Sequence, residues 1–178
     1  MLVGVVFGFP SQGPASFRAE YDCAVDLAVE RAVERGGRRA GGMAVVTDAD
    51  LAPLPGALQK YLRVTGAVGQ PRIRSLRARF RCRIRSGPIS RWMTFTAKQR
   101  NVHEDPARLF FMEATMLGVP LQALHLYVGP RVTMRVKVAS IVQVVDATGP
   151  DLDRAETVTL FNDMCLLAPG ALIDRAIR

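Results

Sequence analysis

Hydrophobic and polar positions alternate most regularly in residues 77–85, which read R-A-R-F-R-C-R-I-R. Successive side chains of a β-strand point to opposite faces of the sheet. The segment is therefore predicted to be a strand with arginine on one face and small or apolar side chains on the other. The five arginines alternate with Ala78, Phe80, Cys82 and Ile84.

The same two-residue period predicts further strands along the chain. They cover residues 91–102, 109–117 and 131–138, and residues 141–145 extend the last of them or start another. Because the connections are short, the strands are expected to form an antiparallel sheet. Ile73 is at an odd position of the alternating pattern and Leu76 at an even one, so the apolar side changes face between them. A β-bulge is therefore expected near Ser75.

Helical spacing of apolar residues predicts three helices, over residues 16–34, 50–65 and 151–168. Pro55 suits the first turn of the second helix. Asp153 and Glu156 have the spacing of a capping box at the start of the third. Helices and strands in separate blocks predict an α+β fold. We expect residues 1–47 to be a helical arm with a linker, and residues 48–178 to form a single α+β domain.

Composition supports one ordinary hydrophobic core. The chain has 178 residues, of which 49% are hydrophobic, and a chain of this length buries about 70% of its unfolded surface. The apolar run at residues 1–9 is shorter than the ~20 residues of a membrane span, and it lacks the basic start of a signal peptide. We therefore expect a cytoplasmic or membrane-associated protein without a complete signal peptide or transmembrane segment.

Charge is distributed unevenly. The formal net charge is +8, yet no acidic residue occurs between Asp50 and Glu104, and this stretch holds 12 of the 24 lysines and arginines. A basic middle with mildly acidic flanks indicates an anionic partner such as nucleic acid, lipid headgroups or an acidic ligand. The alternative is an arginine-rich composition whose charges simply face water.

Two predicted strands, 77–85 and 131–138, both carry basic residues on their polar side. If these faces coincide, like charges lie close together, and such a surface needs counter-ions. The counter-ions are either acids of the predicted helices or an external anion, and the sequence leaves both open. The candidate anion-binding residues are Arg77, Arg79, Arg81, Arg83, Arg85, Arg135 and Lys137.

Signatures of catalysis and of metal binding are absent from the sequence. Three cysteines without a C-x-x-C spacing indicate neither a zinc site nor a disulfide framework. His103 stands beside two acids, but adjacent residues do not converge on one point. We therefore predict no catalytic residue, no metal and no cofactor, and a binding protein rather than an enzyme. An enzyme would need a pocket in which His103 or His125 meets a carboxylate.

Most of residues 48–178 resembles a bacterial protein family of unknown function. The resemblance rests on LPGALQKYLRVTGAVGQPRIRSLRARF at 54–80, RWMTFTAKQ at 91–99, YVGPRVTMRVKVAS at 127–140 and DATGPDLDRAE at 146–156. It implies a curved, half-barrel-like antiparallel sheet with helices packed against it, and many members carry a membrane segment ahead of this domain.

This chain departs from the family pattern in two respects. The family usually has an acid at Lys98 and a proline at Thr94, so this chain is more basic there than the resemblance implies. Family members also continue beyond Ile177, so the domain is expected to be incomplete at its C-terminal end. A missing strand would leave an open sheet edge, through which the protein could self-associate.

The expected function is a non-enzymatic binding role for an amphiphilic or anionic ligand near the bacterial membrane, with an anionic lipid or small amphiphile as partner. A nucleic-acid-binding basic sheet is the alternative. Sheet-based RNA binders expose aromatic residues among the basic ones, whereas Phe80 has the parity of the apolar face. Nucleic acid is therefore the less favoured partner.

Overall fold

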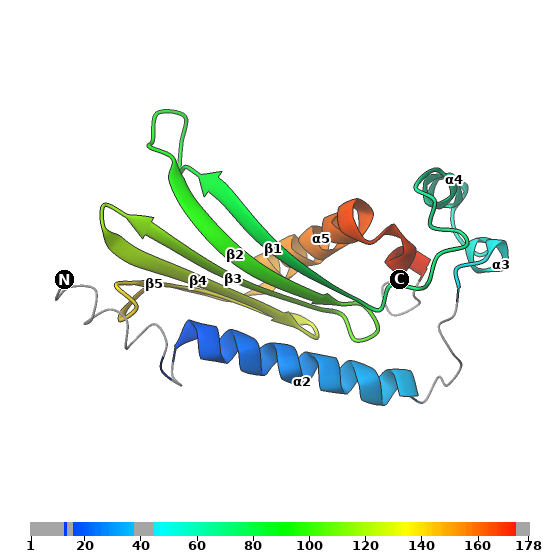
Figure 1. Cartoon of the computed structure of the whole chain (residues 1–178), viewed down its shortest axis with the longest axis horizontal. Helices are drawn as coiled ribbons and strands as arrows, with labels where there is room; N and C mark the ends of the chain where they lie inside the picture. The colour runs from blue at the N-terminus through cyan, green and yellow to red at the C-terminus, as the bar shows by residue number, and fades with distance from the viewer. Residues whose placement is uncertain (1–12, 14–15, 38–44, 174–178) are drawn as a thin grey trace.

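The computed structural model describes residues 13, 16–37 and 45–173. Six strands form one open antiparallel sheet, in which each strand pairs with the next along the chain. They are β1 (Ser75–Ile84), β2 (Met93–Val102), β3 (Ala107–Met116), β4 (Val119–Val128), β5 (Arg131–Val138) and β6 (Val142–Ala147). The sheet is strongly curved (Figure 1). The predicted α+β fold with a curved antiparallel sheet is confirmed.

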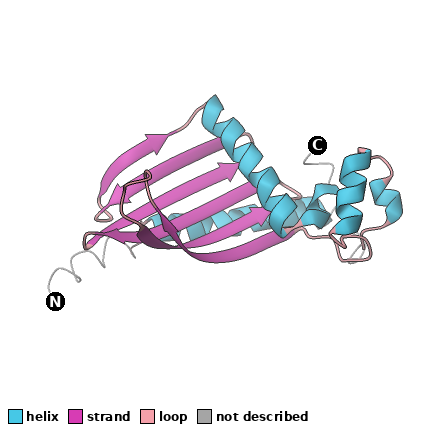
Figure 2. Cartoon of the chain, turned by 90° about the horizontal axis from the view of Figure 1, so that it is seen from above, coloured by secondary structure: helices cyan, strands magenta, loops and turns pink. Residues whose placement is uncertain are grey.

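Helices lie on both faces of this sheet. Helix α2 (Phe17–Gly37) runs along one face, and helix α5 (Pro150–Leu167) crosses part of the other (Figures 1 and 2). Two short helices, α3 (Asp48–Leu51) and α4 (Gly56–Val64), lie at one end of the sheet with the 3-10 helix η1 (Pro169–Ile173). No described helix is both long enough and apolar enough to cross a bilayer.

Helix α2 is held to the sheet by an apolar core and by ion pairs at both ends. Phe17 and Tyr21 are buried in one cluster with Leu109 and Phe111 of β3 and with Leu124 of β4. Ion pairs join Arg18 to Glu113 and Arg35 to Asp105. The helix therefore lies lengthwise along β3, and the predicted helix over residues 16–34 is confirmed.

A second core joins the small helices to α5. Leu51 and Leu62 are buried against Met164 of α5 and Leu172 of η1. The predicted single helix over residues 50–65 is wrong, because the chain forms two helices there. Pro55 caps the start of α4. Its ring restricts the residue before it to extended conformations, which interrupts the helix between Leu51 and Gly56.

Three details of the predicted sheet differ from the structure. Strand β1 begins at Ser75, so Ile73 precedes it and no bulge is needed there; the register shift lies between Val136 and Lys137. The sequence pattern predicts no strand at β4, residues 119–128. Cys82 is exposed rather than buried, because it lies on the outer strand β1, where no helix covers the apolar side.

Some predictions lie outside the described residues, namely the apolar run 1–9 and most of the linker, residues 38–44. The division of the chain at residue 47 stays a prediction, although α2 packs against the sheet. Strands β1 and β6 are the outer strands of the open sheet, and self-association through such an edge also stays a prediction.

Candidate functional site

Four arginines of β1, which we name the arginine row, share the face of the sheet on which α2 lies. They are Arg77, Arg79, Arg81 and Arg83. Cross-strand pairing places Arg77 opposite Arg100 and Arg79 opposite Lys98. Like charges directly opposite one another destabilise a sheet unless anions offset them. The neighbours of the row therefore decide whether it is structural or functional.

Arg77 and Arg79 of the row form part of one wall of a cavity between β1, β2 and α2, which we name the α2 groove. Its volume is about 610 Å³, within the range of small-molecule sites. The sheet contributes Arg77, Arg79, Lys98 and Arg100. The helix contributes apolar side chains together with three carboxylates: Tyr21, Val25, Val29, Asp22, Asp26 and Glu30. One wall is thus basic, and the other is both apolar and acidic.

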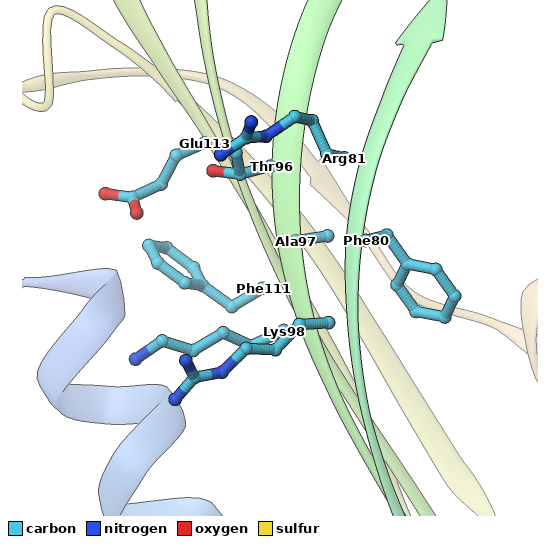
Figure 3. Close-up of a pocket in the computed structure, with 8 residues that line it drawn as sticks. Phe80, Arg81, Thr96, Ala97, Lys98, Phe111 and Glu113 are labelled. Carbon is cyan, nitrogen blue, oxygen red and sulfur yellow. The ribbon is translucent and has the colours of Figure 1, made fainter.

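A second cavity of about 310 Å³, the small pocket, lies beside the groove and shares Arg79 and Lys98 with it. Arg81, Thr96, Lys98 and Glu113 project to the side of α2, whereas Phe80 points to the opposite side of the sheet (Figure 3). Glu113 is already paired with Arg18, which does not line the pocket. The small pocket therefore has an excess of positive charge.

The acids of α2 form no close ion pair with the arginine row, although Asp22, Asp26 and Glu30 line the same groove. Lys98 Nζ is 3.8 Å from an Asp22 carboxylate oxygen. Among the described residues, no member of the row has a carboxylate oxygen within 4.0 Å. Burial, with a smaller contribution from Asp22, raises the pKa of Tyr21 to about 12. The Tyr21 phenol therefore adds a neutral surface to the groove at physiological pH.

The remaining predicted anion-binding residues lie elsewhere. Arg85 donates a 2.7 Å hydrogen bond to the Pro88 carbonyl oxygen and lies over the Trp92 ring. Arg135 and Lys137 belong to the same face as the row, but they lie over the Phe17 ring, and Arg135 pairs with Glu20. Helix α2 therefore divides the predicted basic surface into two parts. Anion binding by any of these residues stays a prediction.

A buried polar cluster lies on the opposite face, under α5. Arg108 donates hydrogen bonds of 2.8 Å to both Glu156 and Asp163. Gln99 and Asn101 also donate to Asp163, at 2.6 and 3.2 Å. Sequence reasoning missed this cluster. The sequence holds one sign of it: the odd positions of β2 are apolar up to Ala97, but Gln99 and Asn101 are polar.

The predicted capping box at the start of α5 is wrong. The helix begins at Pro150 after Gly149, and no side chain caps it. Asp153 instead accepts a 2.8 Å hydrogen bond from the backbone N–H of Val132. Glu156 faces the sheet, where it binds Arg108. Both acids thus join the helix to neighbouring strands.

His125 adds a second contact to this cluster, with its Nδ1 atom 3.5 Å from Glu156 Oε1. Burial opposes ionisation of Glu156, but the proximity of His125 and the charge of Arg108 outweigh it, so the pKa of Glu156 lies below its ordinary value. His125 thus meets a carboxylate, but it lines neither the α2 groove nor the small pocket. Arg108 binds the same carboxylate of Glu156. These contacts join α5 to the sheet, and attachment of this helix is enough to explain them. No group of three potential metal ligands occurs among the described residues.

The lowered pKa of Glu156 predicts acid sensitivity. A carboxyl whose pKa is lower when folded contributes stability above its unfolded pKa and loses it as the pH falls through the folded value. Stability should therefore decline below about pH 4.5, the ordinary value for this group. In Glu156→Gln, the free energy of unfolding should fall less steeply with decreasing pH, as measured by urea unfolding at a series of pH values. Asp151→Asn, on the exposed side of the same helix, is the control, and equal slopes in all three proteins would contradict the prediction.

Comparisons with known proteins identify a family but no characterised relative. No curated protein matches the chain, and no solved structure matches it. A family model described as a family of unknown function, DUF6544, matches residues 44–178. This match covers the sheet, α5 and the small helices, but not α2. The chain therefore belongs to the DUF6544 family of unknown function.

Proposed function

We propose that this protein binds an anionic amphiphile, with the headgroup in the small pocket and the alkyl chain in the α2 groove. The observation that carries the proposal is that Arg77, Arg79 and Arg81 of the arginine row line these cavities and have no carboxylate oxygen within 4.0 Å among the described residues. Guanidinium groups that line a cavity and are not already paired with a carboxylate are available to bind an anion. The proposed role is binding rather than catalysis.

The small pocket suits the headgroup. Arg79, Arg81 and Lys98 supply three positive charges, of which Lys98 lies 3.8 Å from Asp22. The one carboxylate that lines the pocket, Glu113, is already paired with Arg18. Thr96 adds a hydroxyl group that can donate to an anion. Guanidinium groups bind phosphate and carboxylate through paired N–H donors. Both headgroup types therefore fit this chemistry.

The α2 groove suits an alkyl chain. Tyr21, Val25 and Val29 lie one helical turn apart on the wall formed by α2. From Tyr21 to Val29 the helix rises by about 12 Å, and the aliphatic stems of the arginines form the wall opposite. The carboxylates of Asp22 and Asp26 repel a second anion. They therefore favour a ligand with one charged end over an extended polyanion.

This acidic wall also argues against nucleic acid, the alternative partner. A phosphate chain along the arginine row would run past the carboxylates of α2 at every turn of the helix. Nucleic acid binding would show as salt-sensitive retardation in a gel shift assay. Retardation of single-stranded RNA or duplex DNA that Arg79→Ala abolishes would favour the alternative.

Calorimetric titration with decyl phosphate tests the proposal. Each charged hydrogen bond contributes about 1.5–3 kcal/mol, so Arg79→Ala and Arg81→Ala should each weaken binding by about tenfold or more. Arg131→Ala is the matched control, because Arg131 is an exposed arginine of the same face on β5. Its affinity should equal that of the wild type.

Two further ligands test the role of the α2 groove and the role of the arginine row separately. Inorganic phosphate should bind at least tenfold more weakly than decyl phosphate, because it lacks the chain, and a neutral decyl glycoside should bind more weakly because it lacks the charge. Equal affinity for phosphate and decyl phosphate would refute the role of the groove. Wild-type affinity in both arginine variants would refute the role of the arginine row.

A further inference from the structure

Three β-hairpin turns lie along the same end of the sheet, away from α3 and α4 (Figure 1). The antiparallel order places the β1–β2, β3–β4 and β5–β6 connections at this end. We name these segments, residues 84–92, 116–119 and 139–144, the hairpin tips. None of them lines the α2 groove or the small pocket.

The hairpin tips expose large hydrophobic side chains. Nine of the 18 exposed large hydrophobic residues in the described part of the chain lie in these short segments. Ile89 is 100% exposed, Leu117 88%, Ile141 60% and Trp92 54%. Single exposed apolar residues are normal on a surface, but a concentration of them marks an interaction site.

The charges of the hairpin tips all have one sign. Their charged residues are Arg85 and Arg91, and they contain no aspartate or glutamate. Arg85 and the adjoining Arg83 lie over the Trp92 ring, with guanidinium carbons 4.6 and 5.6 Å from its centroid. Tryptophan is enriched at the headgroup level of membranes, and arginine near it attracts anionic lipids.

The backbone conformation of Leu117 indicates that its exposed side chain has a function. Leu117 has φ 52° and is followed by Gly118 with φ 82° in the two-residue β3–β4 turn. Such turns favour asparagine, aspartate or glycine, because a side chain like that of leucine is strained at positive φ. A fully apolar side chain thus projects into solvent from a position that disfavours it.

We propose that the hairpin tips dock the protein on an anionic lipid bilayer. The apolar side chains of all three tips enter the headgroup boundary, and Arg85 and Arg91 bind lipid headgroups. Uniform positive charge matches the surface of an anionic membrane, and a tryptophan flanked by arginines favours the headgroup region of a bilayer. The proposal uses residues outside the ligand cavities and does not rest on the proposed function.

Co-sedimentation of the full chain with lipid vesicles tests this docking surface. Vesicles of phosphatidylcholine with phosphatidylglycerol should retain the protein at low salt, and pure phosphatidylcholine should retain much less. The double variant Ile89→Ser/Leu117→Asn should lower the partition coefficient for anionic vesicles at least tenfold. Asparagine suits the positive φ at position 117, so the turn is preserved.

Val64→Ser is the control, because Val64 is 78% exposed but lies on α4, at the other end of the molecule. It should partition like the wild type. The double variant should also bind decyl phosphate with wild-type affinity, so failure of the docking surface and failure of the ligand site are distinguishable. Equal partitioning of the double variant and the wild type would overturn the proposal, as would an equal loss in Val64→Ser.

Trp92 provides a second readout, since it is the single tryptophan of the chain. Its fluorescence should shift to shorter wavelength on addition of anionic vesicles, and lipids brominated on the acyl chain should quench it. Emission that stays unchanged while the protein sediments with the vesicles would place contact elsewhere on the molecule and overturn the proposal.

Discussion

Replacing Arg108 by methionine is expected to lower the free energy of unfolding by about 3–5 kcal/mol. The Arg108 side chain is only 10% exposed and binds Glu156 and Asp163 of α5. Its loss leaves two carboxylates facing an uncharged side chain in a mostly buried site. Removing one member of a buried ion pair is costly because the remaining charges are no longer compensated. Urea unfolding at neutral pH measures the change.

The matched control is Arg79→Met on β1, since Arg79 is exposed and has no carboxylate within 4.0 Å among the described residues. Its effect should stay within about 0.5 kcal/mol. Adding Glu156→Gln and Asp163→Asn to the Arg108 variant should recover part of the loss, because the unpaired charges disappear. A loss below about 1 kcal/mol for Arg108→Met would show that this cluster does not anchor α5.

The second large effect is expected for Phe17→Ala, which should cost about 3–5 kcal/mol. Phe17 is 1% exposed and fixes the first turn of α2 in the core beside Leu109 and Phe111. Two cations of β5 also lie over its ring, with Lys137 Nζ 4.3 Å from the centroid. The change removes this packing and leaves a cavity. Urea unfolding again supplies the measurement.

Leu27→Ala controls for helix propensity, because Leu27 lies on the exposed side of the same helix. It should change stability by less than about 1 kcal/mol. If Phe17→Ala were equally mild, α2 would be an accessory arm rather than part of the folded domain. The α2 groove would then lack a stable wall.

Strands with one solvated side could be predicted from the sequence, whereas the central strand β4 could not. In β1, arginine alternates with small or apolar residues, and burial alternates in the same way from Arg77 to Arg81. In β4, consecutive residues Gln122, Ala123 and Leu124 are all buried, because both faces of the strand are covered. A strand buried on both faces shows no alternation, so its period gives no signal.

The candidate site was predictable in part. The period of β1 placed the arginines on one face, but the position of α2 over that face depends on the tertiary packing of Phe17 and Tyr21. The separation of Arg135 from the row follows from the same packing. The roles of Arg108 and Asp163 could not be predicted, because each is defined by a partner more than 45 residues away.

The clustering of apolar residues at the hairpin tips could not be predicted from the sequence. Residues 84–92 and 116–119 are far apart in the sequence, and neither segment alone indicates a membrane site. Only the strand order brings them to one end of the sheet. Exposure of Ile89 and Leu117 is likewise a property of the fold, because an isolated apolar residue in a sequence is usually assigned to the core.

The central claim is that the arginine row binds an anionic amphiphile in the cavities beside α2. The most direct test is an NMR titration with decyl phosphate that follows the guanidinium Nε–Hε resonances of assigned arginines. The account predicts saturable shifts at Arg79 and Arg81. Arg131 and Arg154, an exposed arginine of α5 that pairs with Asp151, should be unchanged. Equal shifts at all four arginines, or no saturable shift at Arg79 and Arg81, would contradict it.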